Sequence, residues 1–367
     1  MKKYIILAFL STFLFVLACT KTETIEDKSA TFDRTAFLQN MANTIIKPNF
    51  TALKTKTDAL DLAIQKFATE SNDANLVAAQ TAWEDAYTIW QHCNAFNFGP
   101  AEFPVFGTLN ENIGIFPVNT TKIEDNIKNN NLSFDNFFRD TRGFLALDYL
   151  LFDLDGNTKV LAKYGAAANI RKQYIKNVSA DIKKKVDEVN TGWATYSNTF
   201  LVNNGTDAGS STSYLYNEFI KSFESIKNFK VSLPAGKRVG QTKAEPEKVE
   251  AYYSGKSVKF LKEHLKAIEN IWLGRTMDGN DGVGFEEYLN SVTGGKDLIT
   301  STKAQLLVVN TSINAIPTAT RLSETIEKDL SLVDKAGIEL QKQTRFFKSD
   351  MSSLLGIAIT FSSGDGD

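Results

Sequence analysis

One carboxylate, Asp148, lies in a stretch that is otherwise apolar, and it is the residue of this chain whose setting most invites a chemical role. Eight of the nine residues from Phe144 to Phe152 are apolar or aromatic. A helix that is apolar on all sides belongs in a protein interior, and a buried carboxylate needs hydrogen-bond donors, a cation or a proton. Two hypotheses follow: Asp148 clamps a neighbouring element, such as backbone N–H groups of segment 96–131, or it forms the polar floor of a pocket between domains.

The other residue types that could do chemistry form no recognisable constellation. The two histidines, His92 and His264, lie in no HExxH motif and cannot form a metal-binding pair on one helix. His92 is predicted to be a solvated helix residue and Cys93 a small buried hydrophobe. His264 stands among charged residues, and we expect no metal there.

Further motif templates also fail to match. The segment 278–284 resembles a calcium loop, but Val283 replaces the glycine of the sixth position and Leu289 the glutamate of the twelfth, so it is interpreted as a turn. There is no GxSxG, no P-loop and no GxGxxG that opens a helix. The residues thus point to no catalytic group and no cofactor. A metal ion bound through carboxylates alone stays open, because the chain has 43 acidic residues.

The N-terminus has the features of a lipoprotein signal. Lys2 and Lys3 precede a mostly apolar run of fifteen residues, which is short for a membrane span of about 20. A small residue stands directly before Cys19. We expect a signal peptide over 1–18, lipidation of Cys19, a polar tether over 19–33 and a place in the bacterial outer membrane, on its periplasmic or surface face. A non-cleaved anchor or an ordinary signal is the alternative.

Charge and cysteine content narrow the class further. The formal net charge of −2 gives no reason to expect a nucleic acid partner. The only cysteines are Cys19 and Cys93, so lipidation of Cys19 leaves no intramolecular disulfide.

The elements that must position these residues are predicted to be helices. Apolar residues recur at three- and four-residue steps, as in Leu76, Ala79, Trp83 and Tyr87, and strand-like alternation is nearly absent. The fold class is therefore all-α. Helices are expected at 34–46, 49–70, 73–95, 134–154, 160–195, 212–230, 247–273, 297–314 and 320–356.

Breaks between these helices define the expected domains. Pro48 is predicted to separate the first two helices. Segment 96–131 is predicted to be an ordered irregular region and 197–213 a mobile linker, with a further polar connection at 232–246. The domains are then an N-terminal helical domain at 34–200, which contains the Asp148 helix, and a C-terminal one at 212–367.

Several segments together resemble the imelysin family. They are the lipoprotein signal, Trp83 to Pro100, Ile115-Phe116-Pro117, Arg142 to Phe152, and the ending from Leu355 to Asp367. The resemblance implies an all-α fold of two related helical bundles packed side by side, in envelope proteins historically classed as M75 peptidases and linked to iron uptake. The family's GxHxxE motif would fall on Gly143, Leu145 in place of histidine, and Asp148 in place of glutamate.

This departure from the motif shapes the functional hypothesis. Leucine can neither bind a metal nor transfer a proton, so the location of the family site is carried over without its chemistry. The resemblance implies an interdomain pocket with Arg142, Gly143, Leu145, Asp148 and Tyr149. We expect a ligand-binding or interaction lipoprotein in iron or haem acquisition, without peptidase activity, whose partners are the membrane and an outer-membrane or iron-uptake protein. The alternative is a hydrolase or metal-binding protein that uses carboxylates.

Overall fold

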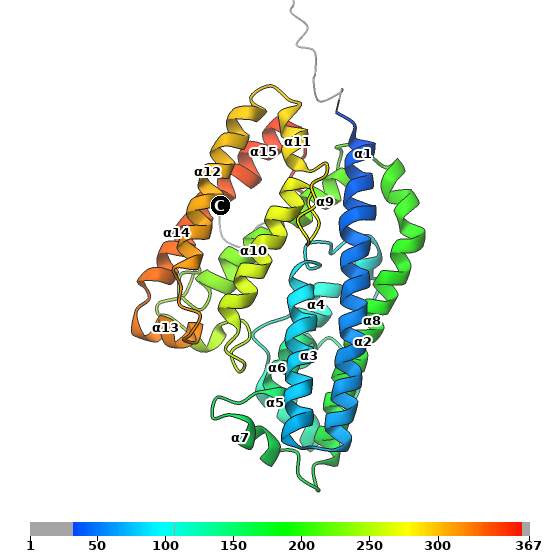
Figure 1. The fold of residues 1–367 in the computed structure, drawn as a ribbon, viewed down its shortest axis with the longest axis vertical. Helices are drawn as coiled ribbons and strands as arrows, with labels where there is room; N and C mark the ends of the chain where they lie inside the picture. Colours follow the sequence, from blue (N-terminus) through cyan, green and yellow to red (C-terminus); the bar gives the residue numbers. More distant parts are fainter. Residues whose placement is uncertain (1–31, 106, 362–367) are drawn as a thin grey trace, which may run out of the picture.

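A computed structural model describes residues 32–105 and 107–361. In that range the protein consists of helices, the segments that connect them and one hairpin of two short strands. Two helical bundles lie side by side, with α8 and α9 joined where the bundles meet (Figure 1). The all-α prediction is confirmed. The predicted signal peptide and Cys19 lie outside the described residues. Among the described helices, none is long and apolar enough to cross a membrane.

The first bundle is built around α2, which packs against both α3 and α8. The short α6 closes the bundle by packing on the same two partners. Trp83 of α3 fixes α6 directly, because its indole N–H donates to the Phe144 carbonyl at 2.8 Å. The helices are α1 (Arg34–Gln39), η2 (Asn40–Ile46), α2 (Lys47–Thr69), α3 (Asp73–Gln91), α6 (Phe144–Leu151), α7 (Asn157–Ala162) and α8 (Asn169–Val202).

The prediction that Pro48 breaks the first helix is wrong. The chain stays helical from Arg34 to Thr69, and the turns from Asn40 to Ile46 are π-helical. Immediately before the proline, the Lys47 N–H donates to the carbonyl of Ala42, five residues back. Proline disrupts a helix because it lacks an N–H and crowds the carbonyl four residues earlier, and the wider π-turn accommodates it.

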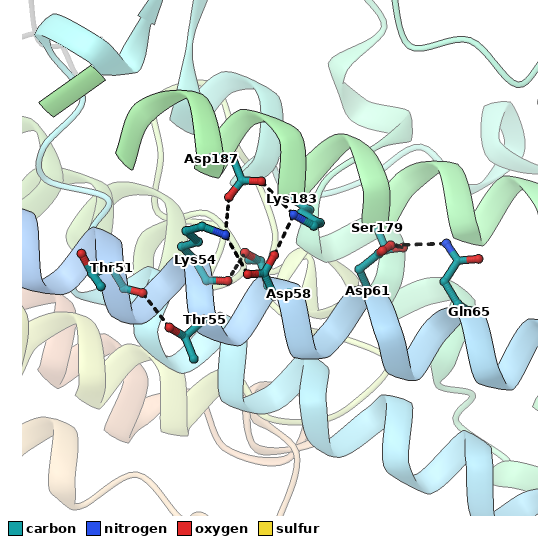
Figure 2. Close-up of polar contacts among 10 residues, drawn as sticks. Thr51, Lys54, Thr55, Asp58, Asp61, Gln65, Ser179, Lys183 and Asp187 are labelled. Atoms are coloured by element: carbon teal, nitrogen blue, oxygen red, sulfur yellow. Dashed lines mark hydrogen bonds and ion pairs between the residues drawn. The ribbon is translucent and has the colours of Figure 1, made fainter. Parts of the chain in front are cut away.

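Charged side chains line the seam between α2 and α8 (Figure 2). Lys54 and Lys183 each contact both Asp58 and Asp187, at 2.7 to 2.9 Å. About a third of each side chain is exposed, so these pairs contribute little to stability. Buried apolar residues such as Leu60 of α2 and Ile182 of α8 account for most of the stabilisation.

An irregular region connects α3 to α6, as predicted. It contains η3 (Gly99–Ala101), the antiparallel strands β1 (Glu102–Phe103) and β2 (Gly107–Thr108), α4 (Leu109–Ile113), α5 (Thr120–Lys128) and η4 (Arg139–Thr141). The expected helix over 134–154 is wrong, because only Phe144–Leu151 is α-helical. Arg142 is extended and Gly143 has a φ of 81°, which ends any helical continuation.

The second bundle contains most of the remaining helices. α12 packs on α14, and α14 packs on η5 and α9. The expected helix over 320–356 is divided at Asp329 and Leu330, and the one expected from 247 begins at Ser257. The elements are α9 (Ser211–Ser225), η5 (Ile226–Ser232), η6 (Pro246–Lys248), α10 (Ser257–Leu273), α11 (Phe285–Asn290), α12 (Gly295–Asn314), α13 (Leu322–Lys328), α14 (Ser331–Thr344), η7 (Arg345–Asp350) and α15 (Met351–Leu355).

The connection between the bundles is shorter than the predicted linker, because α8 continues to Val202. Residues 203–210 are tied on both sides: Ser211 N–H donates to the Asn203 carbonyl at 2.8 Å, and Arg34 donates to the Asn204 carbonyl at 2.7 Å. These bonds join the linker to α1 and α9.

Helices α3 and α10 form the contact that positions the candidate site. The Phe260 ring of α10 packs edge-on against Trp83 and Tyr87 of α3, with centroids 5.6 and 4.6 Å away. His92, predicted to be solvated, is only 5% exposed, and its Nε2 lies 3.3 Å from Glu263 Oε2. That prediction is wrong because α10 covers the face of α3 that would otherwise meet water.

Candidate functional site

Asp148 binds the backbone of the second bundle. Its carboxylate is 1% exposed and accepts hydrogen bonds from the Tyr253 N–H at 2.9 Å and the Ser254 N–H at 3.0 Å. The clamp hypothesis named backbone N–H groups as partners but placed them in segment 96–131. The N–H groups that bind Asp148 belong to Tyr253 and Ser254 instead. Burial raises the pKa of Asp148 to about 6, and the donors from Ser254 and Tyr253 oppose that rise.

The clamped segment, residues 249–254, is here called the strap. Ala251 in the strap has a φ of 51°, a conformation that costs a residue with a side chain on the order of 1 kcal/mol or more. The Ser257 hydroxyl donates to the Glu250 carbonyl and fixes the end of the strap. One cavity borders the strap at Glu250, and another borders it at residue 249 and residues 251–253.

The first cavity, here called the Asp148 cavity, has a volume of about 270 Å³. Asp148 and Leu145 of α6 line it together with Phe116, Tyr252 and Tyr253. Leu145 is 3% exposed, so it presents a hydrocarbon surface where the family motif has an imidazole. Asp148 therefore both clamps the strap and borders a cavity between the bundles.

Arg142 and Gly143 do not line this cavity. Arg142 is 1% exposed and donates to the Phe134 carbonyl and, at 2.7 Å, to Asn112 Oδ1 of α4. Burial lowers its pKa. At Gly143, a Cβ would lie 2.6 Å from the Ile113 carbonyl oxygen, so only glycine fits this close approach at positive φ. Both residues attach the start of α6 to α4.

Tyr149 lies beside the strap, but it is also absent from the lining of the Asp148 cavity. Its ring packs edge-on against Tyr253, with centroids 5.0 Å apart. Its hydroxyl donates to Glu124 Oε1 at 2.6 Å, and Glu124 also pairs with Arg171 of α8. Burial and the Glu124 carboxylate raise the pKa of the tyrosine. Tyr149 therefore packs against the strap and links it, through Glu124, to α8.

A second cavity, here called the Lys230 cavity, was not predicted from the sequence. Its volume is about 210 Å³, and its lining comes from α3, α4, the segments that follow each of these two helices, α9, η5, the strap and α10. Lys230 and Glu250 form a buried ion pair at 2.9 Å, with 5% and 3% of their side chains exposed. Tyr87 donates to the same carboxylate at 2.6 Å, and Lys230 donates to Gln91 at 2.6 Å.

The pKa values of the groups that line the Lys230 cavity are shifted mainly because these groups are buried. Burial lowers the pKa of Lys230, while Glu250 counteracts that shift. The pKa of Tyr87 is raised well above its ordinary value by burial and by Glu250. In the sequence, Lys230 stands between the apolar residues Phe229 and Val231, which is a signal for a buried lysine. Nothing in the sequence connects it to Glu250 or Tyr87.

His264 reaches the same cavity and pairs with a serine. Its Nε2 lies 2.7 Å from Ser222 Oγ, and that hydroxyl also lies 2.7 Å from Asn94 Oδ1. Burial and nearby Lys230 lower the histidine pKa well below its ordinary value, so the ring is neutral at physiological pH. His264 Nδ1 is buried without a hydrogen-bond partner in the described chain.

The side chains near Asp148 bring no metal-binding cluster together. Over residues 32–105 and 107–361, no group of three or more His, Cys, Asp or Glu side chains is arranged to hold a metal ion. Both oxygens of Asp148 accept backbone N–H groups. Backbone N–H groups are donors, whereas a metal ligand needs a lone pair directed at the ion.

Fold and site together define an all-helical protein of two side-by-side bundles, with adjoining cavities where the bundles meet. The chain belongs to the imelysin family, whose model matches residues 46–344. This finding confirms the resemblance expected from the sequence.

Individual relatives agree with this assignment. Iron-regulated protein A of Synechococcus elongatus is 21% identical over 259 residues, which cover 66% of this chain and 65% of that protein. The chain thus spans slightly less than two thirds of this relative. A crystal structure described as an iron-regulated protein A precursor from Parabacteroides distasonis ATCC 8503 superposes with a TM-score of 0.72 at 16% identity, covering 88% of this chain and 95% of that one. An imelysin-like protein from Psychrobacter arcticum 273-4 gives 0.71 at 17% identity, covering 91% and 98%.

Proposed function

We propose that this protein is an envelope lipoprotein that binds a ligand in the cavities between its bundles and serves iron or haem acquisition. The observation that carries the proposal is the convergence of both bundles on the strap, with the Asp148 cavity and the Lys230 cavity beside it. Ligand sites occur preferentially at such interfaces. The iron-related role is supported by the names of the relatives in Synechococcus elongatus and Parabacteroides distasonis.

The proposal includes the absence of peptidase activity. Asp148 is engaged as a structural acceptor for Tyr253 and Ser254. Leu145 occupies the motif position at which the family has histidine. A general base must reach the proton that it removes, and a carboxylate that already accepts two backbone N–H groups is poorly placed for that role.

The cellular setting is part of the same proposal. Lipid on Cys19 would hold the protein at the outer membrane, and the segment before Phe32 would separate the bundles from the bilayer. The expected partner is an iron-uptake or outer-membrane protein.

Titration with two iron compounds tests the proposal. Haem and ferric citrate are added separately to the purified protein while the tryptophan fluorescence is recorded, since Trp83 contacts α6, which lines the Asp148 cavity. We expect saturable quenching by one of the two compounds. Saturation by neither compound would contradict the proposal.

A cavity-filling variant shows where the compound binds. Val118 lines the Asp148 cavity, and Val118→Trp should weaken binding by at least about tenfold. Val77→Trp on α3 is the control, because Val77 is exposed and lines neither cavity. Equal binding by the two variants would place the ligand elsewhere.

A further inference from the structure

The Lys230 cavity carries an excess of uncharged hydrogen-bonding groups. Three asparagines line it: Asn94, Asn97 and Asn110. Asn94 accepts a hydrogen bond from Ser222 at 2.7 Å, and Asn97 accepts one from the Asn110 backbone N–H at 3.1 Å. None of the three side-chain NH₂ groups has a hydrogen-bond partner among the residues that the structure describes. These groups remain available to a ligand.

The charges that line this cavity are already paired. Lys230 pairs with Glu250, and Lys221 pairs with Glu218. His264 contributes no charge, because burial and Lys230 lower its pKa well below its ordinary value. A ligand with a full charge would therefore enter without a free counter-ion, and burying an unpaired charge costs several kcal/mol.

Apolar surfaces complete the lining. Trp90, Phe116 and Phe229 are among the lining residues, and Phe229 is 42% exposed. The volume of about 210 Å³ is below the roughly 300–1,000 Å³ of pockets for drug-sized ligands. The ligand is therefore small, with one apolar face.

We infer that the Lys230 cavity binds a neutral, hydroxyl-rich small molecule of the sugar class. A hydroxyl group both donates and accepts, so it can satisfy the amides of Asn94, Asn97 and Asn110 in either orientation. The C–H face of a pyranose ring would pack on the aromatic side chains. This inference rests on the proposed ligand-binding role and narrows the ligand that occupies one of the two cavities.

Four sugars that share one ring test the inference by calorimetric titration of the full protein at pH 6. Glucose and N-acetylglucosamine are neutral, glucosamine is a cation and glucuronic acid is an anion. We expect at least one neutral sugar to bind, and both charged sugars to bind at least about tenfold more weakly than it does. Failure of both neutral sugars to bind, or equal affinity for the charged ones, would overturn the inference.

A matched pair of variants locates the binding. Asn110→Ala removes an amide whose side chain has no partner in the described chain, and it should weaken sugar binding by at least about tenfold. Asn190→Ala on α8, where the amide oxygen accepts from exposed Thr51, is the control and should bind as the parent does. Circular dichroism melting verifies that both variants fold. Unchanged sugar binding by Asn110→Ala would also overturn the inference.

The same preparation separates this inference from the broader function. If haem or ferric citrate binds in a manner sensitive to Val118→Trp while no neutral sugar binds, only the inference about the Lys230 cavity is wrong. If neither the iron compounds nor the sugars bind, both proposals fail.

Discussion

At the scale of single residues, the site depends on buried charges that are satisfied by different means. Asp148 is held by two backbone N–H groups, no cation of residues 32–105 or 107–361 lies in hydrogen-bond contact with it, and its pKa is raised to about 6. Glu250 has Lys230 and Tyr87 as partners. These two arrangements respond differently to pH and to substitution.

Asp148 should give the stability of the protein a measurable pH dependence. Because its folded pKa of about 6 exceeds its unfolded value of 3.8, the folded state binds the extra proton between these values. Its contribution is therefore fully present below about pH 4 and is lost as pH rises through 6, by on the order of 3 kcal/mol. Urea unfolding of the parent and of Asp148→Asn from pH 4 to 7 isolates this contribution. If the difference between the two free energies of unfolding does not change with pH, the assignment is wrong.

Lys230 should be needed mainly because it neutralises Glu250. Lys230→Met leaves a buried carboxylate without its cation, which should lower the free energy of unfolding by about 3–5 kcal/mol. Lys230→Met combined with Glu250→Gln removes both charges, and we expect it to be more stable than the single variant. Urea denaturation of the parent, the two single variants Lys230→Met and Glu250→Gln, and the double variant gives the coupling energy. A double variant less stable than Lys230→Met would show that the ion pair is not the reason.

At the scale of elements, the site depends on close contacts between α6, α4 and the strap. Gly143 allows α6 to begin against the Ile113 backbone. Asp148, one turn further along, then reaches the strap. The position of the second bundle's backbone is thus linked to the start of one short helix.

Gly143→Ala should destabilise the protein through this contact. A Cβ would lie 2.6 Å from the Ile113 carbonyl oxygen, in addition to the strain of a φ of 81°. Gly156 is the matched control, because its φ is 90° but nothing lies within 4 Å of its Cβ position. Thermal unfolding should show Gly143→Ala to be less stable than Gly156→Ala by roughly 1–3 kcal/mol. Equal losses would mean that the close approach is unimportant.

Helix periodicity predicted the all-α class and several of the long helices, but not the bounds of the others or the partners of any. The Trp83 stripe correctly indicated a buried helix, since apolar side chains at helical spacing must pack on something. The extent of α6 was missed, because an apolar pattern before Gly143 does not reveal an extended backbone. The strap was missed as well: its contacts with Asp148 use backbone N–H groups, which every residue except proline carries and which leave no mark in a sequence.

At the scale of the whole molecule, the two bundles have different relations to the site. The first bundle supplies α6 and its carboxylate, and the second supplies the strap and Lys230. The motif positions Gly143, Leu145 and Asp148 therefore belong to only one side of the interface between the bundles. Its other half, more than 80 residues later, could be found only once the bundles were placed together.

The predicted lipid anchor can be tested on the intact molecule. Mass spectrometry of the protein extracted in detergent from its own bacterium should show loss of residues 1–18 and acyl chains on Cys19. Cys19→Ser should keep the leader and lack the lipid. A native protein that retains residues 1–18, or has an unmodified Cys19, would contradict the expectation.

The most direct test of the central claim, that Asp148 is a structural clamp in a binding protein, is a cleavage assay. The parent and Asp148→Asn are incubated with casein, with and without a chelator, and released peptides are measured. We expect the parent to release no more peptide than Asp148→Asn under either condition. Cleavage by the parent that is abolished by the chelator and by Asp148→Asn would contradict it and identify a carboxylate-based hydrolase.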